Sequence, residues 1–249
     1  MVSTRHHPEE FPAPGTTPIT SPNVARSSSP GPGSRKWVHT PSTAMTFWLV
    51  FSVPLVLWDA GYVLLRPHSM PGGKLHSPIW TPYALYGTVD YIYGWPAFNA
   101  RNGFTAAQTV MNLVETAAYL FYLYVVYEYG TSTTLTGRAS QKKGPKGLVW
   151  FLKEEKVVPG RIGAIALLVA YSASVMTVSK TLLYWLNEVY SGFENIGHNG
   201  LATLIPYWVI PNGLWIIFPS YNIYLLGLEI LSALETATPR ARYGRTKST

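Results

Sequence analysis

The sequence predicts an all-α integral membrane protein, a bundle of five transmembrane helices around an internal apolar cavity. Of its 249 residues, 47% are hydrophobic and only 12% are charged, about half the charged share of a soluble protein. The apolar residues also come in blocks of membrane-spanning length, with most charges between the blocks. The chain has no cysteine, which excludes disulfides, thiol nucleophiles and thiolate metal sites.

Each predicted span is close to the ~20 residues that a ~30 Å hydrocarbon layer requires. The five spans cover residues 46–65, 78–98, 107–128, 162–187 and 203–234. The second is the least regular, because it contains three prolines, two glycines and an aspartate. Its tyrosines and tryptophans are typical of a helix near a membrane interface or buried among other helices. In the fifth span, Pro211 and Pro219 predict kinks.

Segments of different composition flank the bundle, which is expected over residues 46–236. Residues 1–45 are rich in Pro, Ser, Thr and Gly and are predicted to be a disordered tail. Residues 237–249 form a short basic tail. With five spans, 13 Lys and Arg residues fall on one side of the membrane and 5 on the other. The more basic side is expected to be cytosolic, which places the first tail in the lumen and the last in the cytosol.

The loop between the third and fourth spans has two interpretations. Lys142, Lys143 and Lys146 precede an apolar and basic stretch over residues 148–156. Such a pattern is typical of an interfacial helix on anionic lipid. It is equally typical of an ordinary cytosolic loop that obeys the positive-inside rule. Because topology accounts for the net charge of +7, no nucleic-acid partner is expected.

Ionisable residues inside the spans are the candidates for chemistry, because each needs a partner or a polar cavity. Four qualify by their position within the spans: Asp59, Asp90, Glu115 and Lys180. Asp59 either reaches the interface or pairs with Arg66, and Lys180 is a candidate counter-ion for one of the other two carboxylates. Glu229 lies near the cytosolic end of the last span and is expected to snorkel or to pair.

Asp90 and Glu115 are the predicted catalytic pair. They lie on the second and third spans, and the short loop 99–106 between these spans predicts an antiparallel hairpin with both residues at similar depth. Two carboxyls in an apolar cavity raise each other's pKa, so that one donates a proton while the other acts as a base. The alternative is structural, with both carboxyls in hydrogen bonds between helices.

Aromatic residues accompany these carboxyls, among them Tyr119, Tyr184 and Trp215. Aromatic faces stabilise cations in dry sites, so such a cavity suits a carbocation, although aromatic residues in bundles also serve as packing. The sequence has no phosphate loop, nucleophile elbow, zinc helix or dinucleotide fingerprint. No cofactor and no metal are therefore expected.

Several short motifs resemble the emopamil-binding-protein family of sterol isomerases, within the EXPERA superfamily. Residues 207–230 are similar to its last helix, with the Asn-x-x-Trp and the later proline at Asn212, Trp215 and Pro219. Residues 111–121 resemble its carboxylate-bearing helix, with Glu115 followed by Thr116. Residues 178–188 are similar to its fourth helix.

The second span also fits this family, but with changed residues. Tyr86 and Asp90 stand where the isomerases carry a His-x-x-x-Glu pair, and Lys180 with Thr181 stands where they have Gly-Asp. Tyr86 is thus expected to assist Asp90. These departures indicate a related acid-initiated reaction rather than ordinary sterol isomerisation.

The resemblance implies a multi-pass protein of the endoplasmic reticulum membrane with a cavity for a sterol-like ligand. It implies that Asn212, Trp215 and Thr116, with the aromatic Tyr119 and Tyr184, bind the substrate. Two functions are then in competition. One is a cofactor-independent isomerase or cyclase of a sterol or terpenoid, and the other is a non-enzymatic lipid-binding or trafficking protein like the sigma-2 receptor. The expected partners are the bilayer and the small molecule, and a homodimer is left open.

Overall fold

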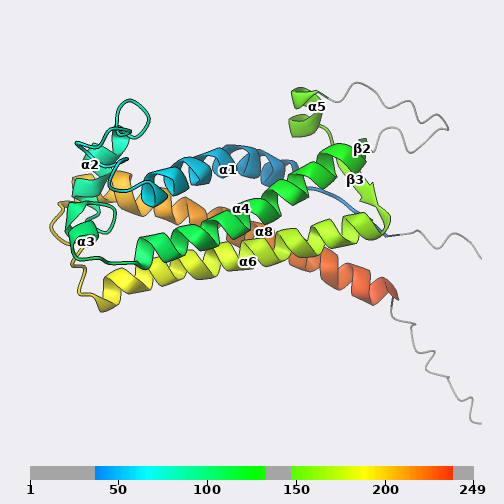
Figure 1. The fold of residues 1–249 in the computed structure, drawn as a ribbon. Coiled ribbons are helices and arrows are strands. Elements are labelled where there is room, and N and C mark those ends of the chain that lie inside the picture. Colours follow the sequence, from blue (N-terminus) through cyan, green and yellow to red (C-terminus); the bar gives the residue numbers. More distant parts are fainter. Residues whose placement is uncertain (1–36, 133–146, 238–249) are drawn as a thin grey trace, which may run out of the picture. The chain divides into compact units, whose positions relative to one another are not determined.

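The computed structural model describes residues 37–132 and 147–237, and this part is mostly helical (Figure 1). It contains four helical segments long and apolar enough to cross a membrane. Three are single helices, α1 (Thr43–Leu64), α4 (Phe104–Tyr129) and α6 (Gly160–Tyr190). The fourth, Leu201–Ala237, joins α7 (Leu201–Leu204), a π-helical turn (Ile205–Val209) and α8 (Ile210–Ala237). The predicted all-α membrane bundle is therefore confirmed, with four spans in the described residues.

The second predicted span, 78–98, is the one that needs correction. It forms two short helices, α2 (Pro82–Val89) with 8 residues and α3 (Trp95–Asn99) with 5. The α-helical conformation ends where Asp90 adopts an extended backbone with φ −125° and ψ 102°. Neither helix approaches the ~20 residues that a span needs. We call residues 65–103 the cap, because they fold over one end of the bundle (Figure 1).

The change from five spans to four also changes the topology. The first residue of α1 and the last residue of α8 now lie at the same end of the bundle (Figure 1). Part of the predicted disordered tail is ordered, because residues 38–39 form a strand and residues 43–45 begin α1. Residues 1–36 and the predicted basic tail from 238 onward lie outside the described residues.

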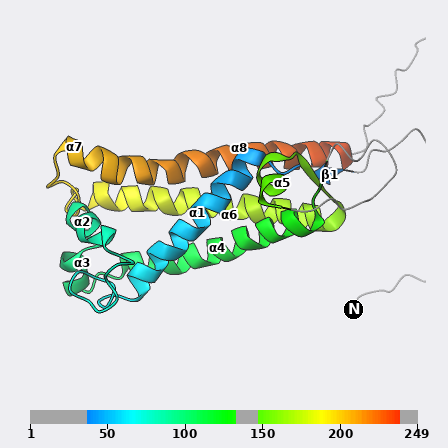
Figure 2. The same cartoon turned by 90° about the horizontal axis from the view of Figure 1, so that it is seen from above.

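The four spans pack in a defined order. The α1 helix packs on α4, α4 on α6 and α6 on α8. Seen from above, α1 crosses the bundle diagonally, so that its first half lies near α8 and its second half near α4 (Figure 2). Each span contributes to one core cluster, through residues such as Leu49, Tyr122, Leu167 and Leu226. Small buried residues on α6, namely Gly163, Ala166, Ala170 and Ala173, recur every three or four positions and allow close helix contact.

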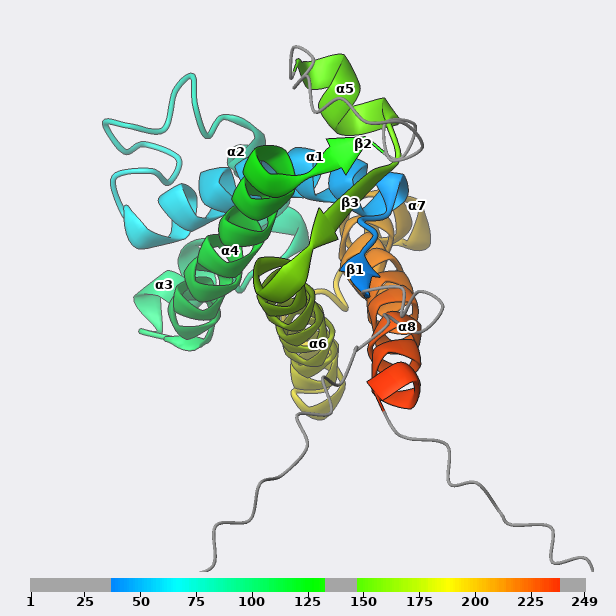
Figure 3. The ribbon, with the colours of Figure 1, turned by 90° about the vertical axis from the view of Figure 1, so that its right-hand side faces the viewer.

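A small antiparallel sheet closes the end opposite the cap (Figure 3). Its strands are β1 (Val38–His39), β2 (Thr131–Ser132) and β3 (Lys156–Pro159), in the order β1-β3-β2. The buried His39 lies with Nδ1 3.0 Å from a carboxylate oxygen of Glu229 and Nε2 3.1 Å from the Tyr122 hydroxyl. Glu229 is therefore paired, as one of its two predicted interpretations required, and it ties β1 to α8.

The stretch 148–156 combines a short helix with a strand. Helix α5 (Leu148–Lys153) exposes Leu148 and Val149, which are 67% and 68% accessible. Lys156 is buried, and its Nζ donates hydrogen bonds to the carbonyl oxygens of Phe151 and Glu154 at 2.8 and 2.7 Å. This lysine therefore satisfies carbonyls at the end of α5. The basic residues that precede the helix, 142–146, lie outside the described residues.

Candidate functional site

Glu115 lies near the middle of α4, as the twelfth of its 26 residues. Its side chain is buried, and Oε2 accepts a hydrogen bond of 2.9 Å from the Thr177 hydroxyl on α6. The same oxygen lies 3.3 Å from Lys180 Nζ, which also donates to Asn112 on α4. Lys180 was predicted to pair with either Asp90 or Glu115, and it pairs with Glu115. An ion pair this far inside a membrane bundle meets the need of each charge for a partner.

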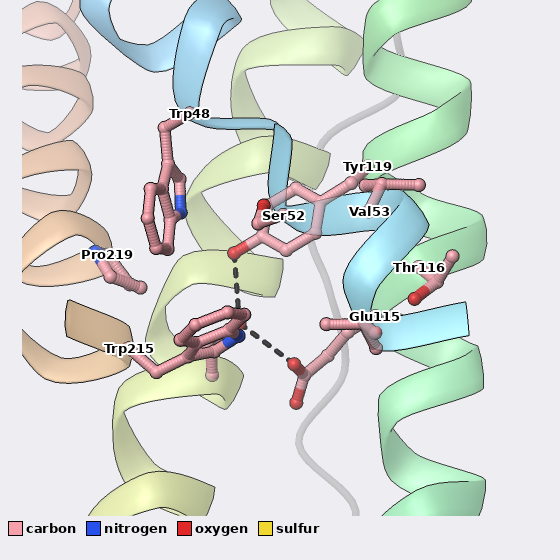
Figure 4. Close-up of a pocket in the computed structure, with 10 residues that line it drawn as sticks. Trp48, Ser52, Val53, Glu115, Thr116, Tyr119, Trp215 and Pro219 are labelled. Atoms are coloured by element: carbon pink, nitrogen blue, oxygen red, sulfur yellow. Dashed lines mark hydrogen bonds between the residues drawn. The ribbon is translucent and has the colours of Figure 1, made fainter. Parts of the chain in front are cut away.

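The other carboxylate oxygen of Glu115 is different, because Oε1 is buried and has no hydrogen-bond partner among the described residues. Glu115 borders a cavity of about 20 Å³. Figure 4 shows its carboxylate pointing toward the indole of Trp215. The other lining residues are Trp48, Ser52, Val53, Val56, Thr116, Tyr119, Thr177 and Pro219. A volume of this size holds about one water molecule.

Aromatic side chains form much of the cavity wall. Trp48 stacks on Phe218 with ring centroids 4.3 Å apart, and it meets the edge of Trp215 at 5.1 Å. The Tyr119 hydroxyl lies 2.9 Å from the Thr177 hydroxyl, which links it to Glu115 (Figure 4). The cavity therefore has an acid on one side and the indole rings of α1 and α8 on the other. A drug-sized ligand needs at least ~300 Å³, so this conformation is closed.

Asp90 lies elsewhere, at the junction between the cap and the bundle. It is buried, and its carboxylate accepts hydrogen bonds from the Tyr184 hydroxyl, from Trp208 Nε1 at 2.9 Å and from the backbone N–H of Ile92 at 3.1 Å. Burial raises the pKa of Asp90 to about 6, against the opposing effect of the hydrogen bonds from Tyr184 and Ile92. Both of its oxygens have partners, in contrast to Glu115.

The eight predicted site residues therefore fall into two groups. Glu115, Thr116, Tyr119 and Trp215 line the cavity. The other four lie at the cap junction, where side-chain hydrogen bonds link Tyr86 to Asn212 and Tyr184, and Tyr184 donates to Asp90. None of these four lines the cavity at Glu115. Tyr184 lies four residues beyond Lys180, so the Asp90 contact is about 6 Å farther along the α6 axis than the Glu115 contact.

Asp59, on α1, pairs differently from the prediction. Its carboxylate accepts a hydrogen bond from the Tyr83 hydroxyl of the cap. The Arg66 guanidinium instead donates to the Thr105 hydroxyl at 2.7 Å and to the Ile92 carbonyl at 3.3 Å. Both side chains thus fix the cap to the spans, and Asp59 does not border the cavity.

Sequence reasoning missed Trp48, Ser52 and Thr177, all of which line the cavity. A signal for Thr177 existed, because the buried polar residues of α6 recur at helical spacing. They are Ser174, Thr177, Thr181, Tyr184 and Glu188. Nothing in the sequence distinguishes Trp48 from other aromatic residues of an apolar span, because its role depends on where α1 crosses α8.

A second hollow, of about 320 Å³, lies between α4 and α6. Its lining is mainly apolar and consists of Val114, Glu115, Ala118, Leu168, Val169, Ser172, Ala173 and Met176. Val114 and Leu168 are 56% and 54% accessible, so this groove faces the surroundings of the bundle. Glu115 therefore borders both the groove and the inner cavity.

Comparison of the chain with protein-family models, curated proteins and solved structures finds no match. Function is therefore inferred from the geometry around Glu115 and from the short motifs of the sequence.

Proposed function

We propose that this protein is a cofactor-independent membrane isomerase or cyclase, acting on a sterol or terpenoid through proton-initiated carbocation chemistry. The observation that carries the proposal is the asymmetry of Glu115. Its Oε2 is held by Thr177 and Lys180, the buried Oε1 has no partner in the part of the chain that the structure describes, and the residue borders an aromatic-walled cavity. An unpartnered buried carboxylate oxygen is expensive in hydrocarbon, which favours a role for it with a ligand.

One carboxyl group suffices for both proton transfers. The proton of the Lys180–Glu115 pair first moves from the Lys180 ammonium to the Glu115 carboxylate, which leaves Lys180 as a neutral amine. Glu115 then gives this proton to one carbon of a substrate double bond, and the neighbouring carbon becomes a cation. The resulting carboxylate is stabilised at once by Thr177 and Lys180, which are already in place. It then removes a proton from a carbon beside the cation, which forms a new double bond and restores the carboxylic acid. The product is an isomer of the substrate.

The aromatic wall suits the intermediate of this reaction. Trp48, Trp215 and Tyr119 border the same cavity as Glu115. A cation over an aromatic face gains up to ~2 kcal/mol when water is excluded. In a substrate with a second double bond, that bond attacks the cation before the proton is lost, and a ring closes. The same site thus serves an isomerase or a cyclase.

In this proposal Asp90 and Tyr86 take no part in proton transfer and have a structural role at the cap. The oxygens of Asp90 are occupied by Tyr184, Trp208 and the Ile92 backbone. Through these bonds Asp90 joins the cap to α6 and to the π-helical turn. Glu115 therefore carries the proton transfer, and Asp90 holds the cap against α6 and the π-helical turn.

Membranes from a heterologous host, supplied with sterol and terpenoid precursors, test the proposal. The wild type is expected to give products of unchanged mass and new retention time, and Glu115→Gln is expected to lose at least ~100-fold in rate. Asp90→Asn serves as the matched buried-carboxyl control and is expected to retain most turnover. Equal membrane-inserted amounts and melting midpoints exclude misfolding. Full activity of Glu115→Gln would refute the mechanism.

The large apolar groove favours a second function. A groove of about 320 Å³ with little polar lining also suits a protein that binds a lipid for trafficking or sensing without chemistry. Saturable sterol binding that is unaffected by Glu115→Gln, with no isomeric product, would support this alternative. For either function we propose the endoplasmic reticulum membrane, on the family resemblance.

A further inference from the structure

An inner cavity of about 20 Å³ cannot hold a sterol, so a ligand that enters this cavity, beside Trp48 and Trp215, must separate two of the spans. The spans are not equally well packed. Within the most apolar window of each of the first three, 39% of the residues are buried, but only 6% in Leu201–Ala237. The last span is thus the one whose most apolar window is least buried inside the bundle.

The two walls of the cavity differ in how they are held. Across α4 and α6, the Glu115–Lys180 ion pair and the Thr177–Glu115 and Tyr119–Thr177 hydrogen bonds hold the helices together. Across α1 and α8, the ring of Trp48 contacts the rings of Trp215 and Phe218. At the cavity, separation of α1 from α8 breaks these ring contacts but no hydrogen bond or ion pair among the described residues, so it is the less costly opening there.

The backbone of the last span also has the features of a hinge. The π-helical turn Ile205–Val209 precedes α8, and π-turns and prolines are the usual places where helices bend. Pro219 lies inside α8 and forms part of the cavity wall. The two helices also diverge toward the cap, because α1 crosses the bundle diagonally (Figure 2).

We propose that the seam between α1 and α8 is a lateral gate, formed by Trp48, Trp215 and Phe218, through which a flat ring-bearing apolar molecule enters from the bilayer. The inference rests on the proposed function for the nature of the ligand. A rigid ring system can take the place of Phe218 against the Trp48 face, where the two rings now stack at 4.3 Å. The ligand then lies between that face and Glu115.

The absence of cysteine allows a direct test by cross-linking. In Trp48→Cys/Phe218→Cys the only two thiols lie on the two sides of the gate, and a short thiol-reactive linker locks α1 to α8. A photoactivatable diazirine sterol in phosphatidylcholine vesicles is the probe. Before locking, it is expected to label peptides of α1 and α8 at the cavity. Locking is expected to reduce this labelling at least tenfold.

The groove between α4 and α6 provides the matched control. Linking the thiols of Val114→Cys/Leu168→Cys, two residues that line the groove, is expected to change labelling at the cavity less than twofold. Labelling that survives the α1–α8 link, or that is lost with the α4–α6 link, would overturn the gate. Loss of labelling without any isomeric product in the unlocked protein would refute the isomerase and leave the gate standing. Turnover that the α1–α8 link leaves unchanged would refute the gate and leave the proposed isomerase standing.

A single substitution tests the gate without cross-linking. Phe218 stacks on Trp48 but does not line the cavity, so Phe218→Ala is expected to speed the onset of probe labelling at least threefold. Ile217→Ala, at a position of the same helix that is 64% accessible, is expected to leave that rate unchanged. An unchanged or slower rate in Phe218→Ala would contradict the gate.

Discussion

At the scale of single residues, Lys180 decides whether Glu115 is stable in its ionised form. The two side chains form a buried pair with N and O 3.3 Å apart. Removing one partner of a buried pair destabilises by about 3–5 kcal/mol, because the other charge is left uncompensated. Lys180→Met is therefore expected to lower the melting midpoint in detergent clearly.

The double variant shows whether the pair itself is responsible. Glu115→Gln/Lys180→Met removes both charges and is expected to recover much of the stability that Lys180→Met loses, as measured in a double-mutant cycle. Additive losses would show that Lys180 acts through other contacts, such as its bond to Asn112, and not through Glu115.

Asp90 gives the molecule a predictable pH dependence. Burial raises its pKa from 3.8 to about 6 in the folded protein, so the folded state holds its proton more tightly than the unfolded state. The stability from this group is fully present below about pH 4 and is lost as the pH rises through about 6. Asp90→Asn removes this titration. The melting midpoint of the wild type minus that of Asp90→Asn is therefore expected to fall between pH 4 and pH 6.5, and a difference independent of pH would contradict this account.

That Glu115 and Lys180 would have polar partners was predictable from the sequence, because a charge inside a span must find a partner or a polar cavity. Which carboxylate Lys180 meets was not predictable, because it depends on the rotation of α6 against α4. The aromatic wall could be predicted only in part. Trp215 stands out in the sequence through its spacing of three from Asn212, whereas Trp48 reaches the cavity only because α1 crosses over α8 (Figure 2).

At the scale of elements, the cap is where the sequence prediction was wrong. Residues 78–98 have the length and composition of a span, but the chain starts and ends short helices at Pro82, Asp90 and Gly94. Pro82 starts α2, Asp90 ends it, and Gly94 precedes α3 with Pro96 in its first turn. Hydrophobicity alone does not separate a spanning helix from an apolar segment that folds against the end of a bundle.

Inside the cap, Gly94 lies close against the backbone of Gly87. A Cβ on Gly94 would lie 2.3 Å from the Gly87 carbonyl oxygen, a distance at which the backbone has to move. Gly94→Ala is therefore expected to destabilise the protein by about 1–3 kcal/mol. Gly103→Ala is the matched control in the same region, because a Cβ there meets nothing within 4 Å. Its effect is expected to stay within about 0.5 kcal/mol, and equal melting midpoints for the two variants would show that the Gly87–Gly94 contact does not hold the cap.

At the scale of the whole molecule, four spans change the expected orientation in the membrane. Fifteen of the 19 Lys and Arg residues precede α1, lie between α4 and the first turn of α6, or follow α8. Only three, Arg66, Lys74 and Arg101, lie in the cap. This charge bias is stronger than the 13 to 5 that five spans give, and it favours placing both ends of the chain in the cytosol with the cap on the other side.

Glycosylation mapping checks this orientation, and the chain suits the method because it contains no Asn-x-Ser or Asn-x-Thr of its own. An acceptor with a flexible spacer, inserted at the start of the chain or after residue 240, is expected to stay unmodified. The same insert in the cap loop at Gly72, where the positive φ of 88° marks a turn with open space around it, is expected to be glycosylated. The five-span topology predicts the opposite result at the start of the chain, because its first tail is lumenal. Modification of an acceptor before α1 together with an unmodified one after residue 240 would therefore restore a fifth span, and with it the hairpin that would bring Asp90 to the depth of Glu115.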